Sequence, residues 1–118
     1  MKYAYSFETK HHSDGEPFLI MRLSQVELVE SFLFCEVHTR DSSRHIWSTL
    51  DGVISGLVDY DETAGNIYEI SVTPTLTTIS NQVDPDGEKP CEIETKELRE
   101  IVEIWLTEKE RMESALKD

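Results

Sequence analysis

The spacing of apolar side chains along the first 23 residues predicts an opening β-hairpin. From Tyr3 to Phe7, aromatic side chains occupy every second position, which places them on one face of a strand. A polar stretch over residues 10–16 contains Asp14-Gly15, a dipeptide that favours turns, and the apolar run over residues 18–23 follows it. Two antiparallel strands joined at this turn are the simplest arrangement.

The next segment predicts a short helical turn followed by a strand. Ser24 and Glu27 have the spacing of a capping box, which favours a helix start, and we expect this helix to end by Glu30. Residues 31–39 are rich in aromatic and β-branched side chains, which are typical of strands. A polar connection over residues 40–44 follows this strand.

Residues 45–58 fit two different structures. As a helix, the segment places its aliphatic side chains on one face and its small polar side chains on the other. As a hairpin, Asp51-Gly52 provides the turn and the flanking apolar residues pair across it. Two glycines inside a helix, Gly52 and Gly56, would cost about 0.8–1 kcal/mol each relative to alanine. We therefore favour the hairpin over the helix.

A further hairpin is predicted around a turn at residues 63–66. Two β-prone runs, over residues 57–62 and 66–73, flank this cluster of turn-forming residues. Pro74 cannot donate a backbone hydrogen bond, so residues 75–80 are expected to form an edge strand or an extended continuation. A threonine-rich edge of this kind could pair with another chain.

The C-terminal part predicts a loop over residues 81–90 and then an amphipathic helix that begins near Thr95. Thr95 is a suitable N-cap residue, although the capping box is incomplete. Helical spacing gathers one apolar stripe, formed by Leu98, Ile101, Val102, Trp105, Met112 and Leu116. We expect this stripe to pack on the sheet. The predicted fold class is therefore α+β, with an antiparallel β-sheet of meander-like hairpins packed against a C-terminal helix.

Length and cysteine usage predict one cytoplasmic domain. A chain of 118 residues has the size of a single domain, so we expect residues 1–118 to fold together. The two cysteines, Cys35 and Cys91, have no CxxC spacing and follow no secretion signal, which favours reduced thiols. No apolar run approaches the roughly 20 residues that span a membrane.

Charge is the property that most narrows the choice of partner. The chain has 24 acidic and 11 basic residues, a formal net charge of −13. Nine acidic residues and a single base, Lys89, lie between Asp59 and Glu94. Such a charge repels nucleic acid and anionic membranes and accelerates the encounter with a cation. We therefore expect a basic protein partner, with no direct binding to nucleic acid or membrane.

Motifs for catalysis, metal binding and cofactor binding are not evident, and we expect a protein that is not an enzyme and has no cofactor. The four histidines lack the spacing of a zinc site. The segment that starts at Asp59 resembles a calcium loop in part, but its glycine is one position late and Ile70 replaces the closing glutamate. Nucleophile elbows and glycine-rich phosphate loops are also lacking.

The acidic end of the hairpin predicted around residues 63–66 is the candidate partner-binding surface. Tyr60 stands there among carboxylates, and aromatic residues beside charged ones are typical of protein interfaces. The loop that follows the sheet adds further carboxylates. The candidate partner-binding residues are Asp59, Tyr60, Asp61, Glu62, Glu69, Asp84, Asp86 and Glu88.

In length, acidity, strand-rich body and final helix, the chain resembles the small immunity proteins of bacterial toxin–immunity systems, particularly those of contact-dependent growth inhibition. The resemblance is one of class and depends on no diagnostic motif, so it assigns no role to individual residues. It implies a cytoplasmic inhibitor that binds a cognate toxin domain, commonly a basic nuclease, and blocks its active site or substrate path.

Two other functions fit the same sequence. The first is a dimeric structural or ligand-sensing module, in which the edge at residues 75–80 or the apolar face of the final helix joins two copies. The second is a DNA-mimic regulator whose carboxylates imitate a track of phosphates.

Overall fold

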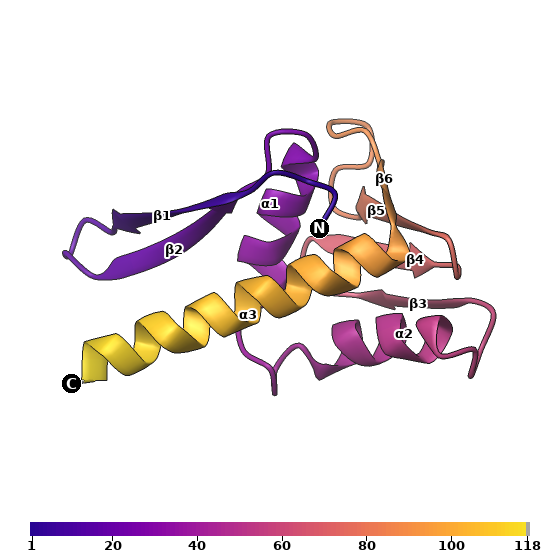
Figure 1. The fold of residues 1–118 in the computed structure, drawn as a ribbon. Coiled ribbons are helices and arrows are strands. Elements are labelled where there is room, and N and C mark those ends of the chain that lie inside the picture. The colour runs from indigo at the N-terminus through magenta and orange to yellow at the C-terminus, as the bar shows by residue number, and fades with distance from the viewer. Residues whose placement is uncertain (118) are drawn as a thin grey trace.

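The structure is a computed structural model that describes residues 1–117 of the chain. Within residues 1–117 the chain forms six strands and three helices (Figure 1). The strands make a two-stranded sheet, of order β1-β2, and a four-stranded sheet, of order β3-β4-β5-β6, and all pairings are antiparallel. This arrangement confirms the predicted α+β fold class. The elements are β1 (Ser6–His11), β2 (Pro17–Arg22), α1 (Glu27–Glu36), α2 (Arg44–Ile54), β3 (Asp61–Ala64), β4 (Tyr68–Val72), β5 (Leu76–Asn81), β6 (Cys91–Glu94) and α3 (Thr95–Lys117).

The opening hairpin is confirmed, although β1 starts later than the aromatic alternation suggests. Ser6 pairs with Arg22 at one end of the ladder and His11 pairs with Pro17 at the other. The turn uses Gly15, which has a φ of +90° that only glycine adopts readily. Tyr3 precedes the strand and packs against the core as part of an irregular N-terminal segment.

The predicted strand at residues 31–39 is wrong, because α1 begins at Glu27, inside the predicted helical segment, and continues as one helix to Glu36. Its N-cap is Val26, without a side-chain cap, so the expected capping box is not formed. Helical spacing places Val29, Phe32 and Leu33 on one buried face. Burial of these side chains stabilises the helix by more than the strand preference of single aromatic residues, which is only about 1 kcal/mol across the whole scale.

The favoured hairpin at residues 45–58 is also wrong, because α2 is a helix. Ile46, Leu50 and Val53 are fully buried on one face. Gly56 lies beyond the helix with a φ of +81°. Its N–H bonds the Val53 carbonyl at 3.1 Å and the next N–H, of Leu57, bonds the Gly52 carbonyl at 3.0 Å, which is the Schellman pattern of helix termination. Only one glycine is therefore inside the helix.

The hairpin predicted around residues 63–66 is confirmed as β3 and β4, with shorter strands than expected. Residues 75–80, expected as an edge strand or an extended continuation, do form a strand, but the edge position is wrong because β5 lies inside the sheet between β4 and β6. Pro74 lies in the turn that joins β4 to β5, where the N–H of Thr73 bonds the Leu76 carbonyl at 2.9 Å. The missed element is β6, which the sequence pattern did not predict and which pairs with β5 along its length.

The helices cover one face of the four-stranded sheet, and α3 runs along the whole assembly (Figure 1). The predicted amphipathic stripe is buried as far as Trp105, whose indole N–H donates to the Val37 carbonyl at 2.7 Å. The hydroxyl of Thr95 donates to the Thr73 carbonyl at 2.7 Å and thus anchors the helix start on the sheet. Toward the C-terminus Met112 is half-buried, and Leu116 is 63% exposed. In the described range 1–117, the helices lack the combination of length and apolar character that a membrane span requires.

Candidate functional site: an acidic open sheet face

The four-stranded sheet leaves one face without a helix on it, and this face is acidic. Successive strand residues point to opposite sides, so the residues opposite the buried positions share the other side. Pairing aligns Glu62, Ser71, Thr78 and Glu92 in one row across all four strands. Strands are about 4.8 Å apart, so this row separates its two glutamates by about 14 Å. Leu76 and Glu94 lie on the same side at one end of the sheet, and we call the remaining set the open sheet face: Glu62, Ala64, Glu69, Ser71, Thr78, Ser80 and Glu92.

The carboxylates of the open sheet face have no basic neighbour on the sheet. The four strands contain no lysine, arginine or histidine. Glu62, Glu69 and Glu92 are exposed, and within residues 1–117 they take part in no ion pair. At the end of β6, Glu94 differs because it is paired with Lys2 and accepts a hydrogen bond from Tyr3 at 2.5 Å. These contacts lower the pKa of Glu94 to about 2.

Exposed apolar side chains lie in the loop between α2 and β3, which leads into the first strand of the open sheet face. Leu57 is 82% exposed and Tyr60 is 53% exposed. The hydroxyl of Tyr60 donates to Glu62 Oε2 at 2.9 Å, which places the ring at the border of the open sheet face. An uncovered aromatic ring held by a carboxylate is a typical anchor for a protein interface.

The structure separates the other candidate residues into three places. Asp59 is exposed in the same loop as Tyr60, but Asp61 pairs with buried Val72 and therefore points to the helix side. Asp84 and Asp86 are exposed in the β5–β6 loop, away from the strands.

Glu88 is half-buried at the base of the β5–β6 loop. It accepts hydrogen bonds from the Tyr68 hydroxyl at 2.9 Å and from Asn81 Nδ2 at 2.8 Å. Burial, and then the Glu88 carboxylate, raise the pKa of Tyr68 to about 12. Glu88 and Glu69 line one shallow hollow with Ser80, so this loop adjoins the open sheet face.

The position of the β3–β4 turn depends on a residue that the sequence did not single out, Glu36. Its side chain is buried at the end of α1 and accepts the backbone N–H groups of Asn66, Ile67 and Tyr68 at 2.9, 2.8 and 2.6 Å. A Cβ at Gly65 would collide with this carboxylate. Glu36 thus fixes the turn that joins Glu62 on β3 to Glu69 on β4. No local sequence motif predicts this role of Glu36.

Outside the Asp59–Glu94 stretch, eight acidic residues of the described range 1–117 take part in ion pairs. Arg40 binds Glu103 at 2.8 Å and Glu110 at 3.0 Å, and Arg99 binds Asp51 at 2.6 Å. Further pairs join Arg22 to Glu8 and Glu30, Arg44 to Asp41, and Arg111 to Glu108. The open sheet face and its neighbouring loops therefore hold a large share of the unpaired acidic residues, and exposed Glu16 and Glu27 add unpaired carboxylates near the first hairpin and the start of α1.

Metal-binding geometry is not found among residues 1–117, where no three histidine, cysteine, aspartate or glutamate side chains gather to hold an ion. The histidines lie in separate segments, with His11 and His12 at the end of the first hairpin, His38 after α1 and His45 in α2. Both cysteines are free thiols whose pKa is raised by burial.

These features define a small, acidic α+β protein that exposes one face of its sheet. No family model and no solved structure matches the chain. A Bacillus cereus protein named "Immunity protein" is 36% identical over 107 residues, which are 89% of this chain and 86% of that protein. The chain therefore belongs to the family of this immunity protein.

Proposed function

We propose that this protein neutralises a basic cognate toxin domain by binding it through the open sheet face and the adjoining α2–β3 loop. The observation that carries the proposal is the set of unpaired carboxylates, Glu62, Glu69 and Glu92, on a sheet face that has no base. Kinship with an immunity protein supports an immunity role, and thus an inhibitor rather than an enzyme.

The chemistry of the face suits a partner that presents arginine and lysine. Hydrogen bonds between these cations and carboxylates are about twice as strong as those between neutral groups. Leu57 and Tyr60 add the apolar contact that charged pairs need in order to exclude water. With a net charge of −13, the protein also attracts a cation over the Debye length, about 8 Å at physiological salt, which raises the association rate.

A nuclease is the toxin class that this surface fits best. A nuclease must present positive charge to the phosphates of its substrate, and a row of carboxylates spaced across a rigid sheet can occupy that surface instead. Asp59, Asp84 and Asp86 would form the outer rim of the contact. As in contact-dependent growth inhibition, the toxin would arrive from a neighbouring cell and meet the inhibitor in the cytoplasm.

The proposal is tested with the product of the neighbouring gene, which we expect to encode the cognate toxin domain. Glu69→Lys combined with Glu92→Lys should weaken the complex on the order of 100-fold, since each change removes one charge pair and adds a repulsion. The matched control, Glu16→Lys with Glu27→Lys, changes the net charge equally at exposed positions on the first hairpin turn and the start of α1. Its affinity should change less than tenfold.

Binding is measured by calorimetry, and growth rescue on co-expression with the toxin gives the biological readout. Loss of rescue with the sheet variant and retention with the control supports the proposal. Equal affinities for the two variants would show that the partner binds elsewhere, and rescue without a stable complex would show that the protein does not act as a binding inhibitor.

A further inference from the structure

A second surface lies at the opposite end of the molecule, where the first hairpin and the C-terminal half of α3 extend beyond the four-stranded sheet (Figure 1). Between them runs an apolar groove, which α1 closes on its third side. We call it the hairpin–helix groove. The residues that define it are Phe18, Phe34, Trp105, Lys109, Met112 and Leu116.

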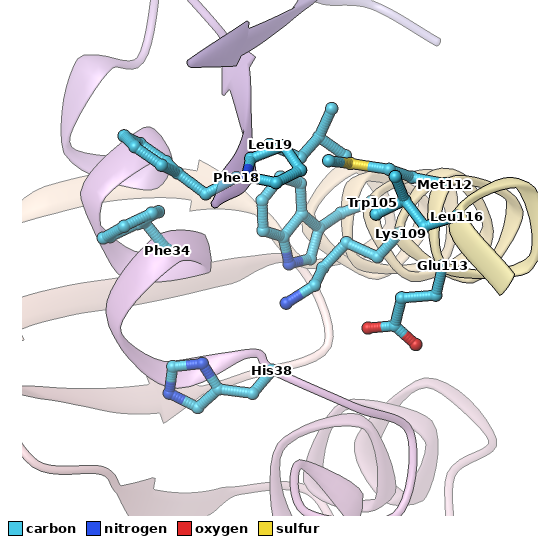
Figure 2. A pocket seen from close by; sticks show the side chains of 10 residues that line it. Phe18, Leu19, Phe34, His38, Trp105, Lys109, Met112, Glu113 and Leu116 are labelled. Atoms are coloured by element: carbon cyan, nitrogen blue, oxygen red, sulfur yellow. The ribbon is translucent and has the colours of Figure 1, made fainter. Parts of the chain in front are cut away.

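The walls of the hairpin–helix groove are apolar and partly uncovered. Phe34 is 44% exposed and stands edge-on to Phe18, with ring centroids 5.7 Å apart. His12 also stacks on Phe18, with ring centroids 4.3 Å apart, which holds the aromatic wall in place. Met112 and Leu116 form the opposing wall from α3, as Figure 2 shows.

A single cation projects into this apolar groove. The ammonium of Lys109 lies 5.3 Å from the centroid of the Trp105 ring, a cation–π distance. Within residues 1–117 it forms no ion pair and no hydrogen bond, although Glu113 stands one helical turn further along α3 (Figure 2). Burial lowers the pKa of Lys109, and Glu113 opposes this effect only in part.

In having no carboxylate partner, Lys109 differs from the arginines of the protein. In a chain with 24 acidic residues, every arginine is bound to at least one carboxylate. A half-buried ammonium without a carboxylate is costly unless a ligand supplies the anion. Lys109 lies between exposed Phe34 and Leu116, so a ligand whose anion reaches Lys109 would also place its neighbouring groups against these two apolar side chains.

We propose that the hairpin–helix groove binds an extended segment of a partner protein that presents a carboxylate flanked by large apolar side chains. The carboxylate would pair with Lys109, and the apolar side chains would cover Phe34 and Leu116. This inference is independent of the proposed toxin contact, because the open sheet face is a separate surface and attracts the opposite charge.

The shape of the surface favours an extended segment over a compact small molecule. A neighbouring hollow shares Leu19, Met112 and Leu116 with the groove and continues around the hairpin toward Phe7. A second copy of the chain is a poorer occupant, because it would bring a further net charge of −13 against the first.

The test uses two short peptides and NMR spectroscopy of the ¹⁵N-labelled protein. The probe is N-acetyl-Leu-Asp-Phe-amide, and its neutral match is N-acetyl-Leu-Asn-Phe-amide. The Asp peptide should shift the amide signals of Phe34 and Lys109 and the indole signal of Trp105, with at least fivefold tighter binding than the Asn peptide. Equal binding of the two peptides, or shifts confined to other parts of the protein, would overturn the proposal.

Two variants then test the role of the charge. Lys109→Met keeps the aliphatic stem and should lower the affinity for the Asp peptide to that for the Asn peptide. Glu113→Gln should raise it, because a competing carboxylate is removed. Lys96→Met, at an exposed site in the first turn of α3, is the control and should leave binding unchanged. If sedimentation shows instead a dimer of wild-type chains, and the indole signal of Trp105 shifts with protein concentration, the occupant is a second copy and the proposal fails.

Discussion

At the scale of single residues, Glu36 is the side chain on which the geometry of the acidic face most depends. A charged carboxylate that is only 5% exposed is stable in a protein interior when its oxygens are satisfied, and here three backbone N–H groups satisfy them. The same bonds hold the turn that connects Glu62 to Glu69. Glu36 is therefore a positioning residue, which acts through the backbone of the β3–β4 turn and not by contact with a partner.

Replacement of this carboxylate by an amide should be costly. In Glu36→Gln an N–H₂ group would face at least one backbone N–H, so we expect the free energy of unfolding to fall by about 2–3 kcal/mol. Glu27→Gln, at an exposed site on the same helix, should change it by less than about 0.5 kcal/mol. Urea denaturation measures both values. A similar, small loss in the two variants would mean that water can satisfy the turn as well as Glu36 does.

At the scale of elements, the sequence pattern predicts structure well where the apolar spacing is clear and poorly where tertiary contacts decide. The first hairpin, the β3–β4 hairpin and α3 follow from their spacing. The helix α2 was mistaken for a hairpin because Gly56 was counted inside it, whereas a glycine at the end of a helix favours termination. The helix α1 was also not predicted in full, because the aromatic residues Phe32 and Phe34 favour a strand by local preference but lie on a helix in the structure.

Prediction of the site was limited by the same missed elements. Once β3 is located, the period-two alternation of a strand correctly places Glu62 and Asp61 on opposite faces of the sheet. The sequence does not show which of these faces the helices cover. Glu92 was absent from the candidates because the four residues of β6 are too few for a recognisable pattern. Glu36 could not be found, since its partners are about 30 residues away in the chain.

The two glycines of the α2 region should respond in opposite directions to the same substitution. A Cβ at Gly52 would meet no atom within 4 Å inside the helix, so Gly52→Ala should stabilise the protein by about 0.5–1 kcal/mol. Gly56 has a φ of +81°, so Gly56→Ala should destabilise it by about 1 kcal/mol or more. Thermal unfolding followed by circular dichroism distinguishes these signs. Stabilisation by both changes would contradict the role of Gly56 as the terminator of α2.

At the scale of the whole molecule, charge has two opposing effects on stability. Ion pairs such as those of Arg40 and Arg99 stabilise the fold, whereas the unpaired carboxylates repel one another. Within residues 1–117, five of the ten ion pairs join two side chains that are each more than a third exposed, and such pairs contribute only about 0–1 kcal/mol each. The excess of 13 negative charges acts over the entire surface. We therefore expect repulsion to be the larger of the two effects.

This balance predicts that salt stabilises the protein. An increase in NaCl from about 20 mM to about 300 mM shortens the Debye length from about 21 Å to about 6 Å, so it screens repulsion between separated carboxylates more than contact between paired groups. The free energy of unfolding should rise on the order of 1 kcal/mol, or about 4 °C in melting temperature. The variant with Glu69→Lys and Glu92→Lys, whose net charge is −9 because each change adds two charges to −13, should gain less. A melting temperature that falls with salt would show that the ion pairs of the arginines, and not the crowding of acidic residues, dominate the electrostatics of the folded state.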